Sequence, residues 1–275
     1  MIIGTVPAHI QANKLRKAET ANAGEGKMDT ALYVGLAHKA ALKRRMDVVA
    51  HNIANISTTA FNKERVVFRQ LLMDAPGAAA TSGGKISYVQ DHGVVRNLNP
   101  GTLIPTSNPL DIFINGRGYL SVQGSDGDTL YTRNGRMTLD SERNLTLLSG
   151  ELVLDENGQT IQFDEDDTDF HIANDGTIST NNGDRGRLGL SQFKNEQGMK
   201  RRGSSLYETN QAPLPTENIT DLTVRSKAFE SSNVNAVESM VEMIDVMRAY
   251  QNASKNGSSI NDLRKDSLKR MAQVR

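Results

Sequence analysis

The sequence contains no cysteine and no tryptophan, and aromatic residues make up only 5% of its 275 residues. Without cysteine, the chain has no disulfide, no cysteine-based zinc site and no cysteine nucleophile. No apolar run approaches the roughly 20 residues that a helix needs to cross a bilayer. The first residues also lack the charge order of a signal peptide, because Lys14, Arg16 and Lys17 follow the apolar start. We therefore expect no membrane insertion and no general secretory signal.

The chain also has no excess of positive or negative charge. Lysine and arginine total 32, and aspartate and glutamate also total 32. The short basic runs at 43–45 and 200–202 have no aromatic residues between them, so we expect no nucleic-acid partner. A chain with no net charge lacks net self-repulsion, which permits self-association.

The residue patterns of common catalytic and metal sites are missing. The five histidines do not have the spacing of helical metal ligands. The acidic stretch 164–169 has Asp169 where a calcium loop needs glycine and Asp175 where it needs glutamate, so we expect a solvated loop. Gly116 and Gly118 lack the third glycine of a dinucleotide fingerprint. The sequence predicts no catalytic residue, no metal and no cofactor, and thus no enzyme.

A helical pattern starts the recognisable part of the chain. Residues 1–27 are polar and weakly patterned, so we interpret them as a disordered tail or a misassigned start. Residues 28–75 are predicted to be an N-terminal helical segment, with a helix over 29–57 and a helical or strand-like continuation over 61–72. The apolar residues of the helix are spaced 4, 3, 4, 3, as in a heptad seam: Leu42, Met46, Val49, Ile53 and Ile56.

The middle of the chain changes to a β pattern. Residues 76–107 are predicted to be a linker or extended segment. Residues 108–210 are predicted to be a β-rich central domain, because short apolar runs alternate with turn dipeptides that tolerate positive φ. These dipeptides are Asn115-Gly116, Asp126-Gly127, Asn134-Gly135, Ser149-Gly150, Asn157-Gly158, Asp175-Gly176 and Asn182-Gly183.

A second helix is predicted within the last segment, 211–275, over residues 234–273. Asn235 has Glu238 three residues later, which is a capping-box arrangement at the start of a helix. Val237, Met240, Ile244 and Met247 repeat the heptad spacing of the first helix. We therefore predict an α+β fold: an all-β central domain flanked by N- and C-terminal helices that pair in a coiled-coil-like stalk. From spacing alone, packing of these helices on their own domain is about equally supported.

Two terminal stretches closely resemble motifs of a known family. Residues 47–61 resemble the N-terminal motif of flagellar rod and hook proteins, L-D-V-I-A-N-N-I-A-N-x-N-T-T-G-F-K, and depart from it at His51, Ser57, Ala60 and Asn62. Ala60 stands where the family's glycine indicates a special backbone conformation, so the turn here is expected to differ slightly. Residues 229–241 resemble the C-terminal motif E-x-S-N-V-N-x-V-x-E-M. Ser107–Asp111, Gly116–Tyr119 and Tyr131–Gly135 resemble signatures of the central domain.

The resemblance implies a structural subunit of the periplasmic rod of the flagellar basal body. It implies delivery by the flagellar type III export apparatus, and a mechanical role in which helices of many subunits pack side by side. The start at Met28 and the length favour the proximal section of the rod, with the distal section as the alternative. From another class, a secreted β-rich carbohydrate-binding module remains possible. The predicted assembly interface is Leu42, Met46, Val49, Asn52, Ile53, Asn55, Ile56, Asn233, Asn235, Val237, Met240, Ile244, Met247 and Tyr250.

Overall fold

The computed structural model describes residues 33–74, 85–203, 205–214 and 222–273. The predicted tail at 1–27 lies outside these residues. The chain divides into two compact units. The first unit contains the chain up to Val49, Val66–Val94 and the chain from Met240, and the second contains Ala50–Arg65 and Val95–Ser239.

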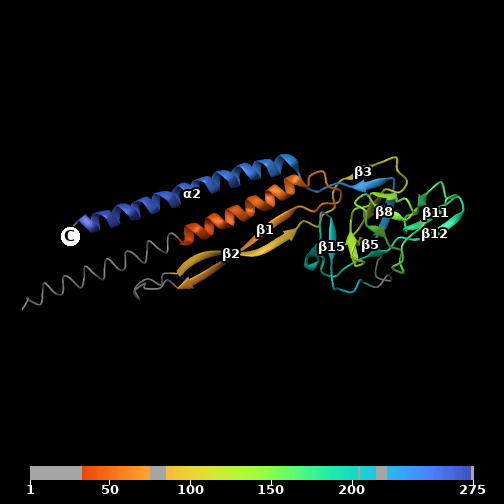
Figure 1. Ribbon diagram of the computed structural model, residues 1–275, viewed down its shortest axis with the longest axis horizontal. Coiled ribbons are helices and arrows are strands. Elements are labelled where there is room, and N and C mark those ends of the chain that lie inside the picture. The colour runs from red at the N-terminus through yellow and green to blue at the C-terminus, as the bar shows by residue number, and fades with distance from the viewer. Residues whose placement is uncertain (1–32, 75–84, 204, 215–221, 274–275) are drawn as a thin grey trace, which may run out of the picture. The chain divides into compact units, whose positions relative to one another are not determined.

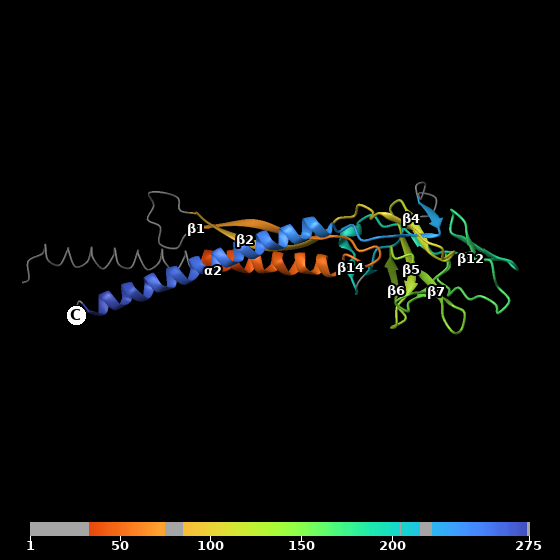
Figure 2. The ribbon, with the colours of Figure 1, turned by 90° about the horizontal axis from the view of Figure 1, so that it is seen from above.

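The first unit contains two long helices and a two-stranded sheet. The described part of the N-terminal helix covers residues 33–54. Helix α2 covers Ala236–Gln273, and strands β1 (Glu64–Asp74) and β2 (Lys85–Arg96) pair with each other. In both ribbon views the two helices and the β1–β2 pair run side by side (Figures 1 and 2).

Of the two continuations predicted for residues 61–72, helical or strand-like, the structure has the strand, β1. This stretch contains Val66, Val67 and Phe68, which are β-branched and aromatic residues that favour strands. Its partner strand comes from the predicted linker, 76–107. Only the pairing of the two segments decides between helix and strand, and the sequence around either one does not reveal it.

The two terminal helices contact each other within the first unit. Arg45 Nη2 lies 2.7 Å from Glu242 Oε1, and Lys39 Nζ donates to Ser254 Oγ at 3.2 Å. Lys39 Nζ also lies 5.2 Å from the centre of the Tyr250 ring. The expectation that both ends of the chain meet is confirmed by these contacts.

The second unit is built from short strands, most of them in the predicted β region. They are β3 (Leu103–Pro105), β4 (Ile112–Asn115), β5 (Tyr119–Gln123), β6 (Thr129–Thr132), β7 (Met137–Leu139), β8 (Leu145–Leu147), β9 (Leu152–Val153), β10 (His171–Ile172), β11 (Thr177–Thr180), β12 (Gly183–Arg187), β13 (Leu190–Ser191), β14 (Lys200–Arg201), β15 (Leu206–Glu208), β16 (Thr223–Ser226) and β17 (Ala228–Glu230). A 3₁₀ turn covers Glu196–Gly198. The α+β class is confirmed.

The main sheet of this unit has the strand order β14-β15-β6-β5-β9-β8-β7, with β13 also paired to β5. A three-stranded sheet has the order β10-β11-β12. Strands β16 and β17 pair antiparallel with β4 and β3. The compact unit therefore extends past the predicted boundary at residue 210, because the segment before α2 contributes two strands to it.

The core of the second unit is closed to solvent. Ile112, Ile114, Leu120, Met137 and Leu145 are all 0% exposed. They belong to one apolar cluster that gathers side chains from β4 to β16. A second cluster consists of Tyr119, Phe193, Met199 and Tyr207. Strands β4, β5 and β8 are buried along nearly their whole length, so the short apolar runs between turns build this core.

The predicted turn glycines fall into two kinds. Gly116, Gly127, Gly150, Gly158, Gly176 and Gly183 have positive φ, as a tight turn requires. Gly135 does not, so the turn predicted at Asn134-Gly135 is wrong in its conformation. A Cβ atom on Gly135 would lie 2.0 Å from the backbone oxygen of Ile112, so glycine is needed here for close approach of two backbones.

Candidate functional site: the α2 stripe and the joint

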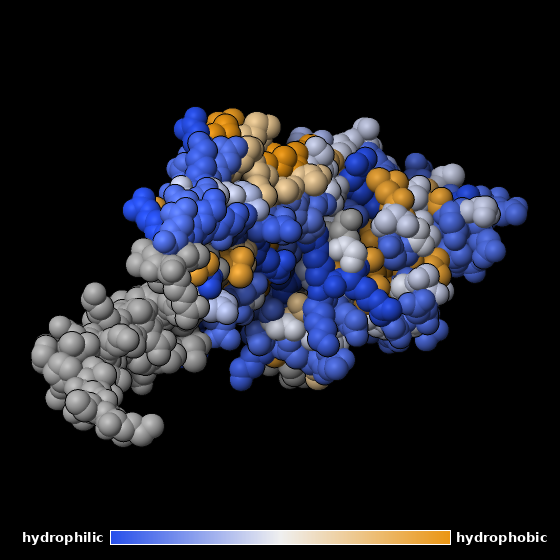
Figure 3. Space-filling view, turned by 60° about the vertical axis from the view of Figure 1, so that its left-hand side comes forward, coloured by the Kyte–Doolittle hydropathy of each residue, from blue (hydrophilic) through white to orange (hydrophobic). Residues whose placement is uncertain are grey.

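One face of α2 is apolar and exposed. Val237, Met240, Val241, Ile244 and Met247 form this α2 stripe, with exposed fractions of 72%, 54%, 53%, 46% and 42%. In the space-filling view, apolar side chains reach the surface among charged ones (Figure 3). Soluble chains rarely expose a contiguous apolar row of this kind without a partner.

The opposite face of α2 is used inside the chain. Ser239 and Val246 are 1% and 2% exposed, and Tyr250 is half-buried beside Lys39. Of the predicted interface residues, the four apolar ones of the α2 stripe are thus free, and Tyr250 is engaged. The residues of both faces of α2 recur every three to four positions, so helical spacing alone does not distinguish the exposed face from the covered one.

The predicted interface residues of the N-terminal helix are mostly covered. Leu42, Met46, Ile53 and Ile56 are half-buried, and Val49 is 3% exposed. A helix side chain that is as deeply covered as that of Val49 packs within its own chain, so it is not free to contact a neighbouring subunit.

The two motifs and the central domain meet at one place, which we call the joint: Asn52, residues 58–64, residues 97–102, Arg133 and residues 228–233, all in the second unit. Asn52, at the end of the N-terminal helix, is 1% exposed. Its Nδ2 donates to the backbone oxygen of Glu64, and its Oδ1 accepts from the backbone nitrogen of Glu64, both at 2.8 Å. Asn52 thus replaces a strand partner at the first residue of β1.

The other predicted asparagines have intrachain roles too. Asn55 Nδ2 donates to the backbone oxygen of His51 at 2.9 Å. Asn235 Oδ1 accepts from the backbone nitrogen of Glu238 at 3.1 Å, which confirms the predicted N-cap. The carboxylate of Glu238 instead lies 3.0 Å from Lys63 Nζ. Asn233 lies in the joint, where its Oδ1 accepts from the backbone nitrogen of Lys63 at 2.6 Å.

A buried ion pair in the joint escaped the sequence prediction. Arg133 Nε donates to Glu230 Oε2 at 2.9 Å, and the two side chains are 7% and 1% exposed. Arg133 also donates to the backbone oxygens of Ile114, Gly116 and Gly118 at 2.9 to 3.0 Å. The signal was available, because Arg133 belongs to the Tyr131–Gly135 signature and Glu230 to the C-terminal motif. Nothing in either stretch shows that they face each other.

Glu230 connects this pair to the other parts of the joint. Its Oε1 accepts from the backbone nitrogen of Gly101 at 2.9 Å, and its backbone oxygen accepts from Ala60 at 2.9 Å. Ala60 is fully buried and has a φ of 55°, so it keeps the left-handed conformation that the family's glycine would adopt easily. That this turn differs slightly from the family's stays a prediction.

The acidic stretch 164–169 is exposed, as the sequence predicted, except at Asp167. The side chain of Asp167 is 0% exposed and accepts hydrogen bonds from Arg185, Thr180 and Asn182. Burial alone would raise its pKa, but the bonds from Arg185, the backbone nitrogen of Asp164 and the two polar side chains outweigh burial and lower the pKa to about 2. No group of residues suited to hold a metal occurs in the described chain.

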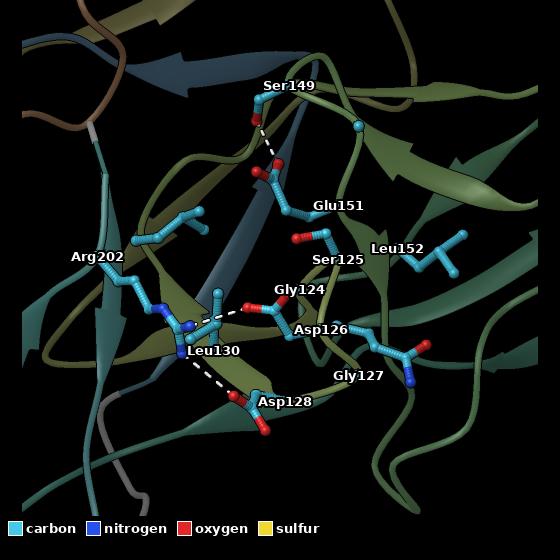
Figure 4. A pocket seen from close by; sticks show the side chains of 13 residues that line it. Gly124, Ser125, Asp126, Gly127, Asp128, Leu130, Ser149, Glu151, Leu152 and Arg202 are labelled. Carbon is cyan, nitrogen blue, oxygen red and sulfur yellow. Dashed lines mark hydrogen bonds and ion pairs between the residues drawn. The ribbon is translucent and has the colours of Figure 1, made fainter.

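A hollow of about 680 Å³ opens between three turns of the second unit (Figure 4). Arg202 Nη2 and Nη1 lie 2.9 and 3.1 Å from carboxylate oxygens of Asp126 and Asp128, so these charges are paired with one another. Ser149 donates to Glu151, two residues later in the same turn (Figure 4). These residues offer neither a histidine nor a lysine that could act as a base beside the serine.

Tyr119 is a fully buried tyrosine whose hydroxyl lies beside a carboxylate. Burial raises the pKa of Tyr119, and the neighbouring Glu196 carboxylate, which accepts its hydrogen bond at 3.0 Å, raises it further. Tyr119 therefore donates a hydrogen bond to Glu196 from within the second apolar cluster.

Comparison with known proteins identifies the family. A model described as the D1 domain of the flagellar hook protein FlgE/F/G matches residues 113–180, and one for the C-terminal part of flagellar basal body rod FlgEFG proteins matches 225–270. The flagellar basal-body rod protein FlgF of Caulobacter vibrioides is 33% identical over 249 residues, which cover 90% of this chain and 100% of that protein. The chain belongs to the flagellar basal-body rod protein family.

Other members match with similar strength. The FlgF protein of Rhizobium meliloti is 33% identical over 82% of this chain and 91% of its own length. The FlgG protein of Bacillus subtilis is 32% identical over 82% of this chain and 92% of its own length. This chain is thus a structural subunit of the bacterial flagellar rod and is located in the basal body. No helix among the described residues is long and apolar enough to span a membrane.

The joint gives the rod-family motifs a physical meaning in this chain. The backbone nitrogen of Asn233 donates to the backbone oxygen of Phe61 at 3.1 Å, so the two terminal motifs meet directly. Asn52 and Arg133 bring in the end of the first helix and the central domain. The stretches that carry the resemblance therefore include the contacts that close the second unit.

Proposed function

We propose that this rod subunit belongs to the proximal rod. There it polymerises through the α2 stripe into the axial drive shaft that carries torque to the hook. The full-length match to FlgF of Caulobacter vibrioides supports the proximal position, and the FlgG relatives keep the distal rod as the alternative. Its neighbours are further copies and other rod subunits in the periplasm, which it reaches through the flagellar type III export apparatus. No enzymatic activity is part of the proposal.

The exposed α2 stripe is the observation that carries this proposal. Burying a large apolar side chain contributes about 1.5–3 kcal/mol, and the five residues of the stripe are 42–72% exposed in the single chain. A helix from a neighbouring subunit is the natural occupant, since a straight apolar row along a helix packs best against another helix. Val49, Asn52 and Asn233 are left out of the proposed surface, because the chain itself occupies them.

A pair of substitutions on α2 tests the stripe. Ile244→Asp places a charge on the stripe, whereas Val246→Asp places the same charge on the face that is 2% exposed. We expect Ile244→Asp to abolish swimming in a complemented deletion strain and to leave the thermal melt of the purified monomer within about 2 °C. Val246→Asp should also abolish swimming, but it should in addition lower the melting temperature of the helical unit, because it buries an unpaired charge.

Asn252→Asp serves as the control for charge alone, since Asn252 is exposed and polar beside the stripe. Cells with this variant should swim. Swimming cells with Ile244→Asp, or a collapsed monomer melt for that variant, would show that the stripe is not an assembly surface.

Electron micrographs of basal bodies from the deletion strain distinguish the two rod positions. We expect no rod to be built on the base when a proximal subunit is missing. A rod that is present at its base and stops short of the hook would favour the distal position.

A further inference from the structure

One side chain in the segment before α2 bonds to two stretches that are distant from it in sequence. Asn233 Oδ1 accepts from the backbone nitrogen of Lys63 at 2.6 Å. Its Nδ2 donates to the backbone oxygens of Asn97 and Asn99 at 2.9 and 2.7 Å. The partners lie before β1 and after β2, so a single amide joins the N-terminal motif, the stretch after β2 and the C-terminal motif.

The chemistry of this place requires an amide. Two carbonyl oxygens need two donors, and one backbone N–H needs one acceptor, and only asparagine or glutamine supplies both from one planar group. An aspartate has the same shape but would set a carboxylate against the two carbonyls. Asn235, two residues later, uses only its oxygen, so aspartate would serve there equally well.

We infer that Asn233 is the positioning residue of the joint: it holds the three segments together, so that load entering through one is shared by all. This inference rests on the proposed function of the chain as a torque-bearing subunit. Glu230 acts on the same segments through Gly101 and Ala60, which places a second set of bonds beside those of Asn233. Asn233 and Glu230 therefore both bond to segments that are distant from them in sequence.

The test compares one chemical change at two neighbouring positions in the full chain. Asn233→Asp removes both donors, and Asn235→Asp keeps the helix cap. Hydrogen exchange on the purified monomer is followed at the amides of Ala60 and Gly101, with Ser121 of the central sheet as reference. We expect Asn233→Asp to speed exchange at Ala60 and Gly101 about ten-fold or more and to leave Ser121 unchanged. Asn235→Asp should change neither.

Cells supply the second measurement. We expect Asn233→Asp to reduce swimming most strongly in viscous medium, where torque is highest, and Asn235→Asp to swim like the parent strain. If Asn233→Asp also speeds exchange at Ser121, the charge has loosened the whole unit. Asn233→Ala then decides, because it removes the same bonds without adding charge.

The inference is overturned if the decisive variant matches Asn235→Asp in exchange and in swimming. That result would leave the proposed function intact provided that Ile244→Asp still stops swimming. Conversely, if cells with Ile244→Asp swim, the α2 stripe is not the assembly surface, whatever the result at the joint. The two failures are therefore distinguishable.

Discussion

The two units of this chain differ in how far they bury their apolar side chains. In the second unit, Ile114 and Leu120 are completely buried by the chain's own strands. In α2, Ile244 remains 46% exposed although it lies in a long, regular helix. The second unit closes its core as a single chain, whereas the helical unit leaves an apolar row exposed, which the proposed function assigns to contacts with neighbouring subunits.

Breaking the buried ion pair should have the largest effect on the second unit. Arg133→Met leaves Glu230 charged and buried, which should cost about 3–5 kcal/mol of unfolding free energy. For a unit of this size, the melt should fall by about 10 °C. Thermal melts followed by circular dichroism measure the loss.

Two further variants sharpen that result. Arg133→Met combined with Glu230→Leu should be less destabilised than Arg133→Met alone, because no charge is left unpaired. Arg202→Met should cost about 1 kcal/mol or less, since Arg202 and its carboxylate partners are exposed. Equal losses for Arg133→Met and Arg202→Met would contradict the assigned role of the buried pair.

The same substitution in each unit compares them directly. Ile114→Ala should destabilise the second unit by about 2–5 kcal/mol, because it opens a cavity in a closed core. Ile244→Ala should change the monomer by no more than about 0.5 kcal/mol, since the side chain is half in solvent. Urea unfolding of both variants gives the two values. A similar loss in both would mean that the stripe is already covered in the single chain.

Acid should weaken the second unit through Asp167. Its pKa is lowered from 3.8 to about 2 in the folded chain, so folding favours the ionised form. The stabilisation is fully present above pH 4 and is lost as the pH falls from about 4 to 2. Urea unfolding across this range measures it. Asp167→Asn cannot ionise, and its profile should be flatter there. Parallel profiles for the two proteins would show that Asp167 is not the titrating group.

The smallest effect concerns backbone strain. Lys227 has a φ of 58°, which an L side chain adopts at a cost. Lys227→Gly should stabilise the second unit by about 0.5 kcal/mol, because relief of strain exceeds the extra chain entropy of glycine. Lys227→Val should destabilise it, since a β-branched residue fits this conformation worst. A rise of the melt with valine would refute this account.

Local patterns were enough to predict much of this fold. The two helices, the cap at Asn235, the antiparallel strands between turn glycines and the family itself follow from spacing and motif. Each depends on neighbours a few residues away, where periodicity and capping chemistry act.

Only the tertiary structure decided the remaining features. The stretch 64–74 becomes a strand because 85–96 pairs with it. Asp167 is buried because Arg185 reaches it, and Asn52 and Asn233 are engaged because distant backbone groups lie within hydrogen-bonding distance. Helix α2 carries two faces of equal spacing, and the sequence does not tell which one its own chain covers. Periodicity reports that a face is apolar, whereas packing against a particular partner decides which face is buried.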